Sequence, residues 1–376
     1  MENLKIRSVD CCSQINSEDW NSVAGTSPFH RKEWIKAWCE TLGKDVEPLI
    51  LIVEDQQKIV GIAPLYIESS VTKGTVVHFL GAGKACSDYA SILVRPEYQT
   101  QVISTIANWL TSSTSEFSWS TMSLEGISTE DPTMEIFAQQ LGRHMVVDRS
   151  PHENSWVIDL PETWDDYLMS LSKRCRRMMR QLDKEHIQSG RATFSIASTA
   201  AEVHHGLNVL IELHTARREE LGCEGCFSDP EFIKLVKKSA HSFFHAGNLR
   251  LGTVYVDERP AAVALSFSHG DSIFAYQCGY DPEFSEMKPG WILNQFQLRY
   301  AIENGYRHFD FLRGDEAYKS RLGARPVELQ RLRISNNTSI GTLRRFAWSA
   351  KTGLKPLVAS WTTDNGSVPK GVAENR

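Results

Sequence analysis

The sequence predicts an α/β protein of two similar domains, each a mixed, mostly antiparallel sheet flanked by helices. At 376 residues the chain is long for a single hydrophobic core, so two domains are expected. A β-hairpin pattern occurs twice, about 200 residues apart, and the elements around each copy follow the same order. Together these observations indicate a tandem repeat of one α/β unit.

The two hairpin segments are residues 49–65, LILIVEDQQKIVGIAPL, and residues 251–267, LGTVYVDERPAAVALSF. Each has two apolar runs on either side of a charged turn with an aspartate, Asp55 or Asp257. This pattern is typical of a β-hairpin. Because the two segments share few identities, chance similarity is the alternative, and the repeat depends on the order of elements.

That order is the same in both halves. A helix with Trp34, Trp38 and Leu42 at helical spacing precedes the first hairpin, and strands near residues 76–80 and 89–94 follow it. In the second half a helix at 202–221 precedes the hairpin, and a strand at 272–279 and a helix at 290–305 follow it. The turn-forming run RSPHEN at 149–154 precedes the strand SWVIDL and marks the boundary.

We therefore expect an N-terminal domain at 1–150, a C-terminal domain at 151–335, and an extension at 336–376. Past Lys355 the chain is rich in Ser, Thr, Gly, Asn and Pro without an apolar period, which predicts a mobile tail.

The composition is that of a soluble globular protein, and its net charge of −5 argues against a general nucleic-acid binder. No apolar run approaches the roughly 20 residues that span a bilayer, and the first residues lack the apolar core of a signal peptide. We expect a cytoplasmic protein without a membrane span.

The eight cysteines are scattered, which indicates reduced thiols, and the apolar patterns around Cys175 and Cys278 predict buried positions. Cys223 and Cys226 have a metal-like spacing, but no further ligands stand at a recognised distance. A glycine-bearing loop explains this segment equally well, so no metal is expected.

The most informative stretch is residues 308–324, HFDFLRGDEAYKSRLGA. Phe309 and Phe311 alternate with Asp310 and Leu312 at strand period. A cluster of polar side chains follows at the end of this strand: Arg313, Asp315, Glu316, Tyr318 and Lys319. Functional groups often gather where a strand ends, so this exit is the candidate site.

Three motifs carry a family resemblance: DFLRGDEAYK at 310–319, KPGWIL at 288–293, and RLG at 321–323. They resemble the GNAT acetyltransferase-like domain of CelD-like proteins of polysaccharide biosynthesis and, more distantly, Fem-type peptidoglycan aminoacyltransferases. The resemblance extends over residues 156–334 and is loose in the first half. It implies tandem GNAT-like domains, which agrees with the repeat.

The resemblance and the chemistry of acyl transfer suggest roles for the strand-exit cluster. The reaction needs a positive group near the acyl carbonyl oxygen and a proton for the leaving group. Lys319 is expected to polarise the carbonyl, as its counterpart does in Fem-type enzymes, and Tyr318 to donate the proton. Asp310 and Asp315 are candidate bases.

Arg313 and Glu316 are expected to contact the substrate. The alternative is a structural network of salt bridges among Arg313, Asp315 and Glu316.

A GNAT enzyme holds the pyrophosphate of coenzyme A at a helix N-terminus with the pattern R/Q-x-x-G-x-G/A. The corresponding residues here include Lys288, Gly290 and Trp291. Lys288 would supply the cation and Gly290 a close approach of the backbone, although the second small residue is absent. A purely structural Pro-Gly turn is the alternative.

Two further segments are candidate substrate contacts. Asp88 and Tyr89 form a pair that also occurs in CelD-like relatives. This resemblance implies that the first domain contributes residues to a cleft between the two domains. A turn capped by Asp88 is the alternative. On a helix at 164–188, the cations include Arg177 and Arg180 at a spacing that places them on one face with Lys173 and Lys184. They would bind phosphates or simply form a solvated face.

The leading hypothesis is an N-acyltransferase, most simply an N-acetyltransferase, that uses acetyl-CoA or another acyl-CoA as donor. Its acceptor would be a small-molecule or carrier-linked amine of a sugar, amino acid or polysaccharide precursor. One alternative is a Fem-like aminoacyltransferase with tRNA as partner, and another is a noncatalytic accessory protein of exopolysaccharide synthesis. The chain has no G-x-S-x-G, which disfavours a hydrolase.

Overall fold

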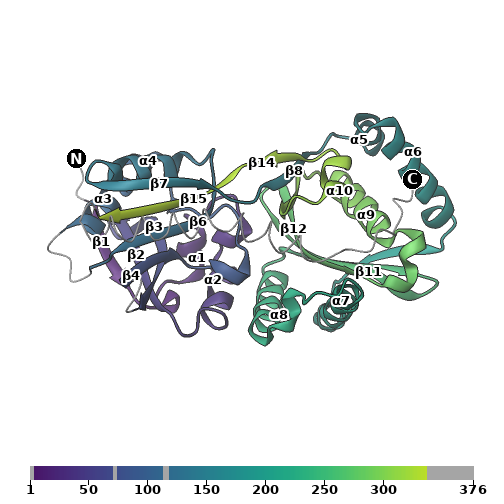
Figure 1. Ribbon diagram of the computed structural model, residues 1–376, viewed down its shortest axis with the longest axis horizontal. Coiled ribbons are helices and arrows are strands. Elements are labelled where there is room, and N and C mark those ends of the chain that lie inside the picture. Colours follow the sequence, from purple (N-terminus) through teal and green to yellow (C-terminus); the bar gives the residue numbers. More distant parts are fainter. Residues whose placement is uncertain (1–3, 71–73, 113–117, 337–376) are drawn as a thin grey trace, which may run out of the picture.

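The computed structural model describes residues 4–70, 74–112 and 118–336, and within these ranges it contains two sheets flanked by helices (Figure 1). Apart from one parallel pair in each, the strands of both sheets run antiparallel. The predicted fold class is thereby confirmed. The expected tail beyond Lys355 lies outside the described residues.

The first sheet has the strand order β1-β2-β3-β4-β6-β15-β7, with β5 paired to β3. Its strands are β1 (Lys5–Val9), β2 (Glu47–Asp55), β3 (Lys58–Ser70), β4 (Gly74–Phe79), β5 (Leu93–Val94), β6 (Thr121–Ser128), β7 (Met145–Pro151) and β15 (Leu329–Asn336). The hairpin predicted at 49–65 is the β2–β3 pair.

Helices cover both faces of this sheet because its strands alternate two sets of apolar side chains. In β2, Ile50 and Ile52 join one core cluster, and Leu51 and Val53 join another. The helices are α1 (Ser17–Asn21) and α2 (Lys32–Cys39) on the first face, and α3 (Gln99–Thr111) and α4 (Pro132–Gly142) on the second.

The second sheet has the order β14-β8-β13-β12-β11-β10-β9. Its strands are β8 (Ser155–Asp159), β9 (Ala192–Ile196), β10 (Leu249–Val256), β11 (Arg259–His269), β12 (Ser272–Tyr280), β13 (His308–Arg313) and β14 (Arg325–Val327). The helices of this half are α5 (Trp164–Ser170), α6 (Lys173–Leu182), α7 (Ala200–Glu220), α8 (Pro230–His245), α9 (Pro289–Glu303) and α10 (Ala317–Arg321). Helices α7 and α8 pack on one face of the sheet and α9 on the other (Figure 1).

Two sequence expectations need correction. The helix expected at 164–188 is divided, because Leu171 is extended and Ser172 begins α6 by accepting a hydrogen bond from the Cys175 N–H. A single π-helical turn, Asp183–Ile187, follows α6. The strand expected at 89–94 is a strand only at Leu93–Val94.

The chain passes from the first sheet to the second and then returns to the first. After β7 the chain crosses into the second sheet, where β8 pairs with β13 and β14. After β14 it returns, and β15 pairs with both β6 and β7 in the first sheet. Figure 1 shows β15, in the yellow-green of the C-terminal part, among the purple and teal strands of the first half. The expected range 151–335 therefore includes a strand of the first sheet.

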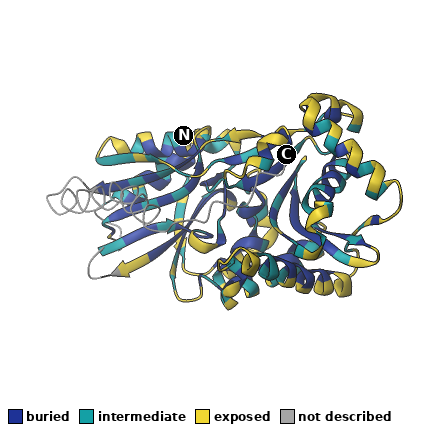
Figure 2. Ribbon diagram, turned by 45° about the vertical axis from the view of Figure 1, so that its right-hand side comes forward, coloured by how far each residue is buried: buried dark blue, intermediate teal, exposed yellow. Residues whose placement is uncertain are grey.

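The two halves also share a hydrophobic core. Trp34 of α2 makes edge-to-face contacts with Phe267 and Tyr276 of the second sheet, with ring centroids 5.9 and 5.1 Å apart. One continuous cluster of buried side chains includes residues of α1, α2, α7 and α8. Figure 2 shows such buried residues, in dark blue, along the strands of both sheets. We expect the two halves to unfold together.

We predict that Leu332→Ala in β15 lowers the free energy of unfolding by about 2–5 kcal/mol, in a single transition. Leu332 is fully buried and pairs with Leu124 of β6, so its removal leaves a cavity in the first sheet. Chemical denaturation followed by circular dichroism measures the change. The control is Leu221→Ala, which removes a side chain that is 61% exposed and should change stability by less than about 0.5 kcal/mol. Equal effects of the two substitutions would contradict the role of β15.

Candidate active site

The second sheet opens beside its central strand β12. Strands β12 and β13 run parallel and pair only through Ser272–Phe274 and His308–Asp310. Beyond this point β12 remains paired with β11 as far as Tyr280, whereas β13 turns away at Leu312, whose φ is 58°. The two strands therefore diverge from a vertex at Phe274 and Asp310.

The exposure of Cys278 shows that this divergence leaves an opening. Cys278 lies on β12 beyond the vertex, and its side chain is exposed, although its neighbour on β11, Ala264, is buried. The prediction that Cys278 is a core residue is therefore wrong, because β13 no longer covers this side of the strand. We call the opening the wedge, defined by Cys278 and Tyr280 of β12 and by Glu316 and Tyr318 after β13.

The corresponding place in the first sheet is filled by the chain itself. Strands β4 and β6 are also parallel and pair only at Val76–Val77 and Thr121–Met122. Past this point the Ala90 N–H donates to the Gly126 carbonyl at 3.0 Å, and β5 pairs with β3. The backbone at 90–94 thus occupies the gap in the first sheet, and the gap in the second sheet has no such filling among the described residues.

Tyr318 supplies a proton donor in the wedge. It lies on the short helix α10, edge-on to Phe311 with centroids 5.7 Å apart, and is partly exposed. Its hydroxyl makes no hydrogen bond to another described residue. Burial raises the pKa of Tyr318, and the nearby Cys278 and Glu316 raise it further. The phenol therefore keeps its proton at neutral pH.

Lys319 points away from the wedge into the turn that follows β13. It is 2% exposed, and its ammonium donates to the carbonyls of Leu312, Arg313 and Gly314 at 3.1, 2.9 and 2.9 Å. It also pairs with Glu316 at 2.9 Å. With its hydrogens committed to three successive carbonyls, Lys319 holds the strand exit in shape and has none left for a substrate carbonyl.

Asp310 lies at the vertex and is almost fully buried. Its carboxylate accepts hydrogen bonds from the Tyr89 hydroxyl at 2.5 Å, the Ser155 hydroxyl at 2.9 Å and the Leu312 N–H at 2.7 Å. Burial raises the pKa of Asp310 to about 6, although these three hydrogen bonds favour the charged form. Tyr89 thus brings the first half of the chain to the vertex.

Asp88 makes the second contact between the halves at this point. It is fully buried, and it accepts hydrogen bonds from the Arg313 N–H at 2.7 Å and from Nε of Arg313 at 2.5 Å. The Arg313 guanidinium also donates to the Ser87 carbonyl at 3.1 Å. Asp88 is therefore more than a local turn cap, because it fixes the second-half strand exit to the first half.

The remaining members of the strand-exit cluster have other partners. Asp315 accepts hydrogen bonds from Nδ2 of Asn154 at 3.2 Å and Nε1 of Trp156 at 3.0 Å, which anchor it to the start of β8. Glu316 is exposed and pairs with Lys319. The salt-bridge network considered from the sequence does not form among the described residues, since Arg313 pairs with Asp88.

The N-terminus of α9 has room for a ligand. Lys288, just before the helix, is exposed and has a φ of 55°. A Cβ atom at Gly290 would meet only the Tyr280 ring, at 3.7 Å, so the backbone there is accessible. Trp291 is partly buried at the edge of the core beneath α9. Gly290 thus borders the wedge through Tyr280, whereas the Trp291 N–H donates to the Lys288 carbonyl at 2.9 Å.

Arg177 and Arg180 lie elsewhere, on the outer helix α6 (Figure 1). Both are exposed, and no described ion pair involves them. The opposite side of α6 buries Cys175 and Met179 in the core that also contains residues of α9. These arginines face solvent, and no described contact joins them to the wedge.

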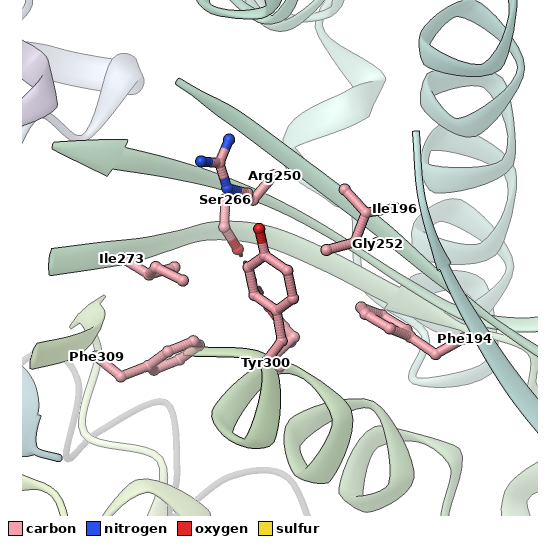
Figure 3. A pocket seen from close by; sticks show the side chains of 9 residues that line it. Phe194, Ile196, Arg250, Gly252, Ser266, Ile273, Tyr300 and Phe309 are labelled. Carbon is pink, nitrogen blue, oxygen red and sulfur yellow. Dashed lines mark hydrogen bonds between the residues drawn. The ribbon is translucent and has the colours of Figure 1, made fainter. Parts of the chain in front are cut away.

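A small pocket lies between α9 and the sheet (Figure 3). Ile273 and Phe309, which are paired across β12 and β13, line it together with Tyr300 of α9. Because these residues precede the vertex, the pocket lies at the closed end of the strand pair. None of the sequence-predicted site residues lines it.

Comparison with known proteins follows this geometry. Residues 170–320 match the family described as acetyltransferase (GNAT) domain. This range contains β12, α9, β13 and most of α10, which are the elements that form the wedge. No curated protein matches the chain.

Three solved structures share the fold over most of the chain. FemX has 12% identity and a TM-score of 0.62, and the match covers 84% of this chain and 96% of FemX. A conserved protein of unknown function from Bacteroides thetaiotaomicron has 9% identity and a TM-score of 0.55, with coverages of 88% and 100%. The C-terminal domain of a putative lysylphosphatidylglycerol synthetase from Agrobacterium fabrum has 9% identity and a TM-score of 0.54, with coverages of 88% and 94%. At these identities the likeness establishes the fold alone.

Among the described residues, no cluster of three His, Cys, Asp or Glu side chains could hold a metal ion. Within the same ranges no helix has the length and apolar character to cross a bilayer.

The residues that sequence reasoning missed include Cys278 of the wedge and Arg217, whose guanidinium stacks on the ring of Tyr280 in the wedge. Cys278 was assigned to the core because it stands in an apolar strand pattern. Arg217 stands in the charged run RREE at the end of α7, which looks like an ordinary solvated helix end. Neither position has a local signal that separates it from many similar ones.

We predict that Gly126→Ala destabilises the protein by about 1–3 kcal/mol more than Gly83→Ala, because it overpacks the contact between the halves. A Cβ atom at Gly126 would lie 2.7 Å from the Ser87 carbonyl and 3.2 Å from the Arg313 guanidinium. Gly83 is the matched control, since its φ of 77° is similar to the 72° of Gly126 and its Cβ would meet nothing within 4 Å. Denaturant titration measures both changes, and equal losses would contradict close packing at this contact.

Proposed function

We propose that this protein is an acyl-CoA-dependent N-acyltransferase, most simply an N-acetyltransferase, and that the wedge is its active site. The observation that carries the proposal is an accessible opening beside a central strand, next to a free phenol, in the part of the chain that matches the acetyltransferase domain. The residues at the N-terminus of α9, Lys288, Gly290 and Trp291, would hold the donor's phosphates.

The reaction requires two proton transfers. The acceptor amine nitrogen bonds to the acyl carbonyl carbon, and the carbon–sulfur bond breaks. The Tyr318 phenol gives its proton to the leaving thiolate, and the amine loses one proton. No covalent intermediate with the enzyme is needed, because the donor is already activated.

Asp310 and Tyr89 form the path for the amine's proton in this proposal. A carboxyl group with a pKa of about 6 can take up a proton near neutral pH. Asp310 is too buried to touch a substrate, but the partly exposed Tyr89 donates a hydrogen bond to it and can relay the proton.

Lys319, Arg313 and Asp88 act as positioning residues, because they hold the backbone that carries Tyr318. Asp315 and Glu316 support the same turn.

The acceptor in this proposal is an amine of a sugar, an amino acid or a polysaccharide precursor in the cytoplasm. The motif resemblance to CelD-like proteins supports that class.

Two observations favour a second candidate, a Fem-like aminoacyltransferase that uses aminoacyl-tRNA. The likeness to FemX extends over 84% of the chain. In addition, the exposed Arg177 and Arg180 of α6 have no ion-pair partner among the described residues. A row of cations without partners suits a polyanion such as RNA.

We predict that acetyl-CoA protects Cys278 from alkylation and that Tyr318→Phe slows acetyl transfer about 10²–10⁴-fold. Mass spectrometry of the alkylated peptides reports Cys278, with the exposed Cys11 of the first half as internal control. Thiol release across a panel of amines reports transfer.

Unchanged Cys278 labelling with acetyl-CoA, together with equal transfer by both proteins, would contradict this assignment. Protection of Cys278 by an aminoacyl-tRNA, and not by acetyl-CoA, would establish the second candidate instead.

We also predict that kcat/KM rises with pH through about 6, as Asp310 loses its proton and becomes able to accept another. Tyr89→Phe removes the proton relay and also a hydrogen bond that lowers the pKa of Asp310, so kcat/KM should fall and the acidic limb of the remaining activity should move to higher pH. Tyr98→Phe is the control, because it removes a similar Tyr–Asp hydrogen bond, to Asp55, in the first half. If the acidic limb of the pH profile stays in place in Tyr89→Phe, Asp310 is not part of the proton path.

A further inference from the structure

Arg217 stands at the mouth of the wedge. It lies near the C-terminal end of α7, and its guanidinium is 4.1 Å from the centroid of the Tyr280 ring. Tyr280 is the last residue of β12, and its ring also faces Gly290 at the start of α9. Arg217 is thus placed where β12, α7 and α9 meet, and it is partly buried.

The described residues give Arg217 no anionic partner. Two other arginines stack on aromatic rings, Arg299 on Trp164 and Arg259 on Phe284. Each of these also pairs with a carboxylate, Arg299 with that of Asp183 at 3.1 Å and Arg259 with that of Glu283 at 2.8 Å. No described ion pair or hydrogen bond involves the Arg217 side chain, so its guanidinium N–H groups remain available to a ligand.

The groups that face Arg217 do not neutralise it. Arg218 is the adjacent cation, and the groups across the wedge are Cys278, Tyr318 and Glu316, whose carboxylate is paired with Lys319. The positive charge of Arg217 acts on both the Cys278 thiol and the Tyr318 phenol. Arg217 is therefore close to the two side chains that line the opening.

We infer that Arg217 binds an anionic oxygen group, a carboxylate or a phosphate, of a substrate in the wedge. A partly desolvated guanidinium without a partner is costly, and its planar set of donors matches such a group in bidentate fashion. Stacking on Tyr280 fixes the plane of the guanidinium and leaves its edge for the ligand. The assignment to a substrate rests on the proposed function, but the anion preference can be measured without it.

The first experiment uses two thiol reagents of similar size, the anionic iodoacetate and the neutral iodoacetamide. Arg217 should attract the carboxylate to the neighbouring Cys278, so the ratio of the two alkylation rates should be higher at Cys278 than at Cys11. We expect Arg217→Met to lower the ratio at Cys278 about 5- to 10-fold, a Coulomb effect of roughly 1 kcal/mol. Arg174→Met, which removes an exposed cation of α6, should leave it unchanged. An unchanged ratio in Arg217→Met would overturn the inference whether or not the protein is a transferase.

The second experiment identifies the source of the anion. If Arg217 binds the donor's phosphates, Arg217→Met should weaken binding of acetyl-CoA about 10-fold or more and leave that of acetyl-pantetheine, which has no phosphate, unchanged. If it binds the acceptor, the substitution should raise KM for glucosamine 6-phosphate relative to glucosamine, or for alanine relative to alaninamide, with little change in kcat. A loss of the same size with every ligand in these pairs would overturn the assignment to an anionic group.

Discussion

The buried ion pair between Asp88 and Arg313 is the interaction on which the rest of the site depends. Asp88 comes from the loop that fills the gap in the first sheet, and Arg313 from the strand exit of the second. A fully buried carboxylate must be satisfied where it lies, and the Arg313 backbone and side chain satisfy it together. Such a pair contributes less to net stability than to the specificity of the fold. Any other placement of the two halves would leave a buried charge without its partner.

The turn after β13 shows how few of the polar residues in a dense motif remain free for chemistry. Leu312 and Gly314 both have positive φ, at 58° and 114°, and this unusual backbone turns three carbonyls toward one point. The Lys319 ammonium occupies that point. The charged run at 313–319 is therefore mostly scaffold, and Tyr318 is the member whose reactive atom stays uncommitted. Strain at the turn and the buried lysine are two parts of the same arrangement.

Local patterns were sufficient to predict the elements, and long-range pairing decided the site. The hairpins at 49–65 and 251–267 were predictable because a period of two residues and a charged turn are local properties. Where β12 and β13 cease to pair depends on the whole second sheet, so the exposure of Cys278 could not be inferred from its apolar neighbours. Asp88, Tyr89 and Lys319 were recognised as important, but their partners lie in the other half or in backbone carbonyls that no sequence pattern identifies. The division of the helix at 164–188 did have a local signal, since Ser172 is a strong N-cap residue.

The position of β15 affects how the protein forms during synthesis. Translation proceeds from the N-terminus at about 5–20 residues per second, and domains usually fold as they emerge. Here the strand that joins β6 to β7 is encoded after every strand of the second sheet. Until almost the whole second half has been synthesised, β6 and β7 of the first sheet therefore each have an edge without its partner strand. A nascent chain of this kind needs protection from neighbouring chains for longer than a protein in which each domain is completed before the next begins.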